Sequence, residues 1–185
     1  MLLDQHRTAL VLIDVQEKLT AVMHQKDALL RSLQKIIQAA VVLDIPIIWN
    51  EQNPSRMGPT VESLRSILKP AEPLEKMCFG CCDNAACMEA LRQTQRDQIL
   101  VAGIESHVCV LQTVSQLMAK GYEVQVLADA ISSRNPFDQE IAQQKIAHIC
   151  RNQALPPLTT VEAALFEMMR TAEHPNFKDI LKIIR

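Results

Sequence analysis

The sequence predicts a three-layer α/β/α domain, Rossmann-like, built on a mainly parallel sheet of about six strands. Short apolar runs rich in β-branched residues alternate along the chain with segments whose apolar residues recur at helical spacing. The runs are apolar throughout, which is typical of parallel strands that helices cover on both faces. The 185 residues contain no internal repeat, low-complexity tract or linker. We therefore expect one domain that spans residues 1–185.

The first half of the chain is expected to supply three strands and two helices. Continuous apolar runs indicate the strands, and Pro46 is acceptable because it stands near the start of its strand. Apolar residues three and four positions apart indicate the helices, one of which interrupts a proline-rich segment, residues 51–75. In chain order these elements are the strand Thr8–Val15, the helix Leu29–Leu43, the strand Ile45–Trp49, the helix Thr60–Leu68 and a short strand around Leu74–Cys78.

The second half is expected to contain two strands and five helices. Apolar runs indicate the strands Gln98–Gly103 and Glu123–Ala128. Residues that favour N-cap positions precede most of the helices. The expected helices are one from Asp83 to about Arg92, one from Ser106 to Gly121, one from Asp138 to Ile149, one over Thr160–Arg170 after a Thr159/Glu162 capping box, and a last one over Phe177–Ile184.

Composition excludes several classes of partner. The formal net charge of -2 gives no attraction to nucleic acid or to an anionic membrane surface, and aromatic residues make up only 3% of the chain. No apolar stretch is long enough to span a bilayer. The N-terminus shows no secretion signal, so we expect a cytoplasmic protein whose six cysteines are reduced thiols.

The segment Gly103–Cys109 joins the end of a buried strand to a helix and presents a cysteine there. Ser106 is a suitable N-cap, which would place Cys109 in the first helical turn. Free backbone N–H groups and the positive end of the helix dipole lie at that position, and both favour thiolate over thiol. Cys109 is thus a candidate nucleophile. The alternative is a cysteine that merely packs in the core.

Ligands of parallel sheets bind beyond the carboxyl ends of the strands, and this rule points to two further residues. Asp14 closes a strongly apolar strand, where a carboxylate suits proton transfer, although it could instead begin a loop or cap a helix. Lys76 stands near the end of the short third strand and could pair with Asp14 and stabilise a thiolate or oxyanion. A cysteine, a base and a cation together meet the requirements of covalent acyl transfer.

The other cysteines and the histidines do not form a convincing metal or redox site. Cys78 and Cys81 have CxxC spacing and Cys82 follows, but no matched second pair of ligands is present. We therefore expect packing rather than a metal or redox role. His107 is two residues from Cys109, and side chains at that spacing on a helix point to different faces.

Several motifs taken together resemble the isochorismatase-like cysteine hydrolase superfamily, and most closely its isochorismatase-domain-containing proteins of undefined substrate. The resemblance implies that Asp14 is the general base, that Lys76 completes the triad and that Cys109 is the nucleophile. It also implies a cis peptide bond at Ile104–Glu105, with the Glu105 and Cys109 N–H groups forming an oxyanion hole. The matching segments are Leu12–Gln16, Glu51–Pro54, Glu75–Lys76 with Phe79, Gly103–Val110, Asp129–Ala130, Ser132–Arg134 and Thr159–Glu162.

The sequence departs from the superfamily in one respect. Its nicotinamidases hold a divalent metal with an Asp-x-His pair and a further histidine, whereas this chain has Glu51-Gln52-Asn53 with no histidine nearby. We therefore expect a hydrolase without metal or cofactor, acting on a small amide, imide or related metabolite through a cysteine thioester. The alternatives are a binding protein with vestigial catalysis and isochorismate-type ether hydrolysis.

By position, the pocket for this small molecule is expected to have five lining residues: Trp49, Gln52, Phe79, Ile131 and Ser133. The resemblance also implies a homo-oligomer, to which the amphipathic segment Phe177–Ile184 is expected to contribute.

Overall fold

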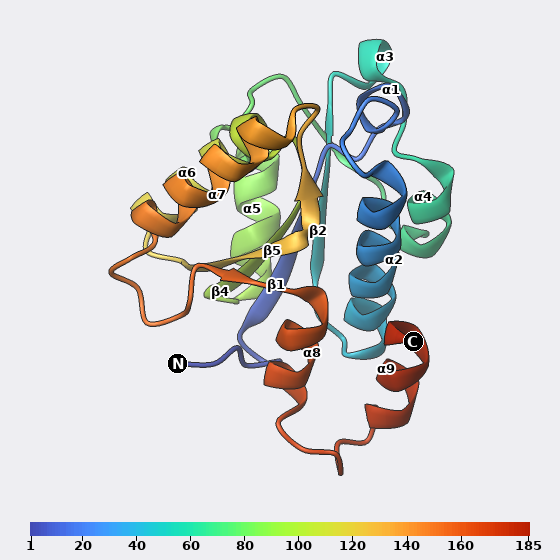
Figure 1. The fold of residues 1–185 in the computed structure, drawn as a ribbon, viewed down its shortest axis with the longest axis vertical. Helices are drawn as coiled ribbons and strands as arrows, with labels where there is room; N and C mark the ends of the chain where they lie inside the picture. Colours follow the sequence, from blue (N-terminus) through green and yellow to red (C-terminus); the bar gives the residue numbers. More distant parts are fainter.

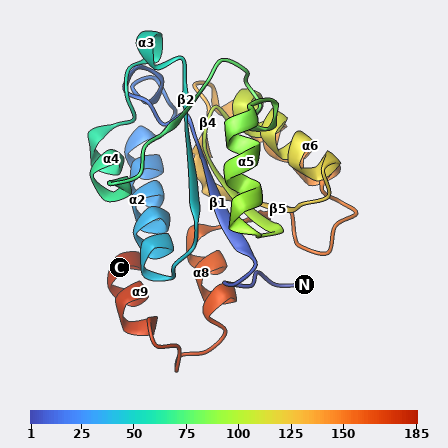
Figure 2. The same cartoon turned by 180° about the vertical axis from the view of Figure 1, so that it is seen from behind.

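The computed structural model describes residues 1–185, and its six strands form a single parallel sheet with helices on both faces (Figures 1 and 2). The predicted three-layer α/β/α fold is confirmed. No helix is long and apolar enough to cross a membrane. The strands are β1 (Thr8–Ile13), β2 (Ile47–Gln52), β3 (Leu74–Lys76), β4 (Gln98–Ile104), β5 (Glu123–Ser132) and β6 (Leu158–Thr159).

The strand order β3-β2-β1-β4-β5-β6 puts β1 and β4 side by side in the middle of the sheet. From β1 the chain winds outward to β2 and β3, and then it returns to β4 and winds the other way. The crevice beyond the carboxyl ends of the strands at this reversal is where doubly wound sheets bind ligands. Ile13, the last residue of β1, pairs with Asn50 of β2 and Gly103 of β4, so the strand ends meet there.

Alternate side chains of the fully buried strand β1 enter two separate cores. Leu10 and Leu12 pack with one set of helices, whereas Val11 and Ile13 pack with the other. The first set is α2 (Lys26–Val42), α4 (Glu62–Leu68), α8 (Val161–Met169) and α9 (Phe177–Ile184). The second set is α5 (Ala85–Thr94), α6 (Leu111–Ala119) and α7 (Pro136–Ile149). Burial on both faces explains why these strands are apolar throughout.

Two short helices, α1 (Glu17–Thr20) and α3 (Pro54–Met57), were not predicted. They lie next to each other beyond the carboxyl ends of the strands (Figure 1). The helix α9 has the predicted bounds, but it packs on the first core through the buried Ile180. Phe177, Ile183 and Ile184 are partly buried against the same core, and the contribution of this helix to a homo-oligomer stays a prediction.

The predicted helix caps are corrected at three places. Asn84 rather than Asp83 caps α5, and Asn135 rather than Asp138 caps α7, where Pro136 takes the first helical position. The Thr159/Glu162 capping box does not form, because Thr159 belongs to the unpredicted strand β6. Thr160 caps α8 instead, accepting a hydrogen bond from the Ala163 N–H.

We expect Asn84→Ala to lower the free energy of unfolding by about 1 kcal/mol, the usual value of an N-cap. The Asn84 side chain accepts hydrogen bonds from the N–H groups of Ala86 (2.9 Å) and Cys87 (3.1 Å), which would otherwise lack partners. Urea denaturation measures the change. Asp83→Ala is the control, since it removes only an exposed contact with Gln116. A larger loss in the control than in Asn84→Ala would contradict the assignment of the cap.

Candidate active site

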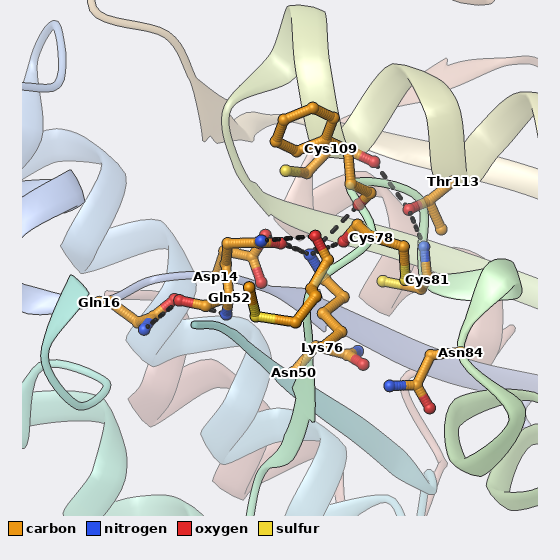
Figure 3. A network of polar contacts seen from close by, with 12 residues as sticks. Asp14, Gln16, Asn50, Gln52, Lys76, Cys78, Cys81, Asn84, Cys109 and Thr113 are labelled. Carbon is orange, nitrogen blue, oxygen red and sulfur yellow. Dashed lines mark hydrogen bonds and ion pairs between the residues drawn. The ribbon is translucent and has the colours of Figure 1, made fainter. Parts of the chain in front are cut away.

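Asp14, Lys76 and Cys109 come together at the carboxyl end of the sheet (Figure 3). Asp14 follows β1 with a φ of 53°, a left-handed conformation that aspartate tolerates better than most residues. Lys76 is the last residue of β3. Cys109 belongs to a π-helical turn, Ser106–Val110, that joins β4 to α6. The strand-end rule thus placed all three residues at one edge of the sheet.

Asp14 and Lys76 form a fully buried ion pair. The distance from Lys76 Nζ to Asp14 Oδ2 is 2.7 Å, and both side chains are 0% exposed. The ammonium group also faces the Gln52 Oε1 atom at 2.9 Å and the carbonyl oxygens of Cys78 and Phe79, each at 3.2 Å. Burial alone would lower the pKa of Lys76, but the nearby Asp14 carboxylate helps to raise it. Four acceptors surround three N–H bonds, so Lys76 acts on the site as a fixed positive charge.

The second carboxylate oxygen of Asp14 is available to take up a proton. Oδ1 is buried and has no hydrogen-bond partner. Burial raises the pKa of Asp14 above its ordinary value, although the Lys76 charge opposes this effect. A buried carboxylate with one oxygen held and the other free has the properties of a general base.

Cys109 rests as a thiol, which corrects the expectation that its helix position favours the thiolate. Burial raises the pKa of Cys109, and the Asp14 carboxylate raises it further; the Lys76 charge opposes both. Ser106 makes no cap, since Glu105 occupies the N-cap position and the buried Ser106 hydroxyl has no partner. The nucleophile would therefore need a base to remove its proton, and Asp14 is close enough for the two groups to shift each other's pKa.

The segment before Cys109 is held by contacts on both sides. The Ile104–Glu105 peptide bond is cis. Glu105 Oε2 accepts hydrogen bonds from the N and Nε atoms of Arg134, each at 3.1 Å, while the Glu105 N–H itself donates to no group of the protein. On the other side, the Thr113 hydroxyl donates to the Cys109 carbonyl at 2.7 Å and accepts from the Cys81 N–H at 3.0 Å.

A cavity of about 280 Å³ opens onto Cys109, a size that suits a small metabolite. Gln52 and Phe79 line it, as predicted from their positions. The Gln52 side chain also donates to the Met77 carbonyl, so both ends of its amide are engaged. The remaining lining residues are Leu19, Asn53, Arg56, Met57, Ile104, Glu105 and Val108.

Trp49, Ile131 and Ser133 do not line this cavity, which corrects their expected role. Trp49 precedes Gln52 by three positions, so its side chain enters the opposite face of β2, where its indole N–H donates to the Thr60 hydroxyl at 2.8 Å. Ile131 is packed in the second core. Ser133 is completely buried, with its hydroxyl 2.9 Å from the His107 Nδ1 atom.

Gln16 is a fully buried residue of the site to which the sequence assigned no role. Its amide binds both backbone groups of Gln52, accepting from the N–H at 2.7 Å and donating to the carbonyl at 3.0 Å. It also donates to the Gly58 carbonyl at 2.7 Å. Gln16 thus connects the segment after β1 to the end of β2 and to the loop after α3. A glutamine two positions after Asp14 is the only sequence signal for it.

Glu51 and the cysteines other than Cys109 were the other residues considered for a metal or redox site. Glu51, at the position that the nicotinamidase comparison singled out, accepts hydrogen bonds from the Thr60 N–H (2.6 Å) and hydroxyl (2.8 Å). Cys81 and Cys82 are buried, Cys78 is half-buried, and all six cysteines are free. No group of three or more acidic, histidine or cysteine side chains is arranged to hold a metal ion.

The chain is similar over most of its length to known proteins of one family. The isochorismatase domain model matches residues 8–162. The chain is 34% identical to isochorismatase domain-containing protein 2A of Mus musculus over 176 residues, which cover 95% of this chain and 82% of that protein. It is 33% identical to the secreted isochorismatase effector Isc1 of Phytophthora sojae over 184 residues, 97% of this chain and 85% of that protein.

Among solved structures, the MAR1 ribonuclease of Caenorhabditis elegans has a TM-score of 0.90 and 31% sequence identity. The match covers 100% of this chain and 92% of that one. The domain match spans most of the chain, and the relatives align over nearly its full length. The chain therefore belongs to the isochorismatase family of hydrolases.

Proposed function

We propose that this protein is a cysteine hydrolase that cleaves a C–N bond of a small amide, imide or related metabolite without a metal ion. The observation that supports this most strongly is the arrangement of Asp14. One of its oxygens is bound by buried Lys76, and the other is free beside a cysteine that rests as a thiol. A carboxylate with a free oxygen beside a thiol supports the assignment of Asp14 as the base and Cys109 as the nucleophile.

In the first half of the proposed reaction, Asp14 takes the proton of the Cys109 thiol as the sulfur attacks the substrate carbonyl carbon. The tetrahedral intermediate places its oxyanion between the N–H groups of Glu105 and Cys109, and the free N–H of Glu105 supports this assignment. Asp14 then returns the proton to the leaving nitrogen, the C–N bond breaks, and an amine or ammonia departs. The acyl group remains on Cys109 as a thioester.

In the second half, Asp14 is again a carboxylate and removes a proton from the attacking water. The water oxygen bonds to the thioester carbon, the C–S bond breaks, and the sulfur regains its proton from Asp14. The product is a carboxylic acid. Lys76 keeps its proton throughout, and its charge favours the carboxylate form of Asp14 and the thiolate of Cys109.

A screen of small amides, ureides and imides tests the proposal. We expect the wild-type protein to release ammonia or amine from at least one of them and Cys109→Ala to release none. Rapid quenching and intact-mass measurement should show a mass increase equal to the acyl group on the wild-type protein alone. Hydrolysis by Cys109→Ala at the wild-type rate would overturn the cysteine mechanism. No turnover and no adduct with any compound would favour a binding protein.

We further expect Gln52→Glu to shift the acid limb of the pH profile of kcat/KM to higher pH. Hydrolysis needs Asp14 as a carboxylate, so the rate falls as the pH falls through the pKa of Asp14, which burial has raised. The charge of Lys76 lowers the pKa of Asp14, and the carboxylate introduced by Gln52→Glu would partly neutralise that charge. The pKa of Asp14 would therefore increase further.

Gln52→Met is the control for this prediction, because it removes the hydrogen bond to Lys76 without adding a charge. Its acid limb should lie closer to that of the wild-type protein. A limb that moves to lower pH in Gln52→Glu, or equally in both variants, would contradict the coupling of Gln52 to Asp14 through Lys76.

A further inference from the structure

Lys76 and Cys109 belong to chain segments that no strand pairing connects directly. Lys76 ends the edge strand β3, whereas Cys109 follows β4, and β2 and β1 lie between these two strands. The distance between the ammonium group and the thiol is therefore set by contacts beyond the ends of the strands. The segment after β3, residues 78–83, supplies them on the Lys76 side, where the carbonyl oxygens of Cys78 and Phe79 accept from the ammonium group.

The segment 78–83 is also bound to α6, the helix that begins directly after the π-helical turn. The Cys81 N–H donates to the Thr113 hydroxyl at 3.0 Å, and the Cys82 N–H donates to the Gln116 side-chain oxygen at 3.1 Å. Thr113 and Gln116 are three positions apart, so they lie on one face of α6. The segment 78–83 therefore connects the ammonium group of Lys76 to α6.

Thr113 is the side chain that joins this segment to the nucleophile. Its hydroxyl donates to the Cys109 carbonyl oxygen at 2.7 Å and accepts from the Cys81 N–H, and Figure 3 shows both bonds meeting at Thr113. An N–H group only donates and a carbonyl oxygen only accepts, so the direction of both bonds is fixed. Thr113 is completely buried. Gln116 has no such link to Cys109, since its amide nitrogen donates to Asp83.

We propose that Thr113 is a positioning residue that holds Cys109 within reach of Asp14 and Lys76. Its hydroxyl ties the turn that carries the nucleophile to the segment that binds the Lys76 ammonium group. Without the hydroxyl, the Cys81 N–H and the Cys109 carbonyl both lose a partner, and the turn is free to shift. The inference deepens the proposed function and rests on it for the reaction, but the placement of the sulfur beside Asp14 does not depend on turnover.

Thr113→Val tests the proposal, because valine has nearly the shape of threonine and lacks the hydroxyl. We expect kcat for the hydrolysed amide to fall on the order of 10²-fold, the cost of misplacing a reacting group by about 1 Å. KM should change little, since Thr113 does not line the cavity. Thr113→Ser keeps the hydroxyl and should recover most of the loss in kcat. A valine variant with wild-type kcat, or a serine variant as slow as the valine variant, would overturn the proposal.

Gln116→Met is the matched control, because it removes the other hydrogen bond between α6 and the segment 78–83 without touching Cys109. Gln116→Met and Thr113→Val should both lower the midpoint of urea denaturation, since each removes the acceptor of a backbone N–H. Only Thr113→Val should lower kcat. An equal loss of kcat in Gln116→Met would show that these bonds act through the general stability of the segment, and it would overturn the role of Thr113.

The second test needs no substrate and measures the rate at which iodoacetamide alkylates Cys109. In this reaction an S–C bond forms, iodide leaves and the thiol proton goes to a base. The Asp14 carboxylate raises the pKa of Cys109, so Asp14→Asn should speed alkylation. That acceleration depends on the distance between the two groups, so it should be roughly threefold smaller when Thr113→Val is also present. Gln116→Met should leave the acceleration unchanged.

The two tests separate this inference from the proposed function. A smaller acceleration without hydrolysis of any amide supports the positioning role of Thr113 and counts against the reaction. The same acceleration with and without Thr113→Val would overturn the inference, even if the wild-type protein hydrolyses amides.

Discussion

Replacing Asp14 with asparagine is expected to lower hydrolysis by about 10²- to 10⁴-fold, the usual contribution of a general base. The amide group cannot accept the thiol proton, return it to the leaving nitrogen, or activate water against the thioester. Because Cys109 rests as a thiol, nothing else at the site replaces these steps. The measurement is kcat/KM for whichever amide the wild-type protein hydrolyses.

The same substitution should make Cys109 more reactive toward iodoacetamide at neutral pH. The Asp14 carboxylate raises the pKa of Cys109, while Lys76 lowers it. Asp14→Asn removes the first effect and keeps the second, so the pKa of Cys109 falls and more thiolate is present at neutral pH. Hydrolysis and alkylation should therefore change in opposite directions. A fall in both would indicate a damaged site, and unchanged hydrolysis would show that Asp14 is not the base.

Asp14→Asn should also destabilise the fold by about 3–5 kcal/mol, because it leaves a buried ammonium without its counter-ion. The matched variant is Asp14→Asn combined with Lys76→Met, which removes both charges. Its free energy of unfolding should exceed that of the single variant, while its hydrolysis remains low. Recovery of stability without recovery of activity separates the structural role of the pair from the chemical role of Asp14. A double variant less stable than the single one would contradict this account.

The three residues of the site could be predicted because each is recognised by its residue type and its position after a strand, and neither depends on how side chains pack. A strand that ends in a carboxylate, a strand that ends in a lysine and a cysteine after Gly103 are visible in the sequence. The rule that ligands bind at the carboxyl ends of parallel strands then brings them together. Their protonation could not be predicted in the same way. The helix start favours a thiolate at Cys109, but burial and the Asp14 carboxylate outweigh it, and both depend on tertiary structure.

The lining of the cavity was harder to predict for a related reason. Side chains of a strand alternate between faces, so a register error of one residue moves a side chain to the other core. Trp49 and Gln52 were both assigned to the pocket, yet they lie on opposite faces of β2. Arg56 and Met57 come from the short helix α3, which a proline-rich sequence did not suggest. The Gln16 side chain binds backbone groups of Gln52 and Gly58, and such contacts produce no periodic pattern in the sequence.

The second large effect that we expect is at Gly103, on β4 where it adjoins the end of β1. Gly103→Ala should prevent the protein from folding or destabilise it by more than the ~1–2 kcal/mol that a left-handed backbone alone costs an alanine. Gly103 has a φ of 118°, and an added Cβ would lie 2.1 Å from the Ile13 carbonyl oxygen and 2.7 Å from the Ile13 nitrogen. These are backbone atoms in the middle of the sheet, so they cannot move aside as a flexible side chain would.

Gly121→Ala is the matched control for this collision. Gly121 also has a positive φ, 86°, but an added Cβ there would have no atom within 4 Å. Gly121→Ala should lower the free energy of unfolding only by the cost of the left-handed backbone, about 1–2 kcal/mol. Urea denaturation gives the free energy of unfolding of each variant, and the difference between the two values measures the cost of the steric clash between β4 and β1. Equal losses of stability would show that the positive φ alone accounts for the need for glycine at both positions. A much larger loss of stability at Gly103 would show that the close approach of β4 to β1 requires a residue without a side chain.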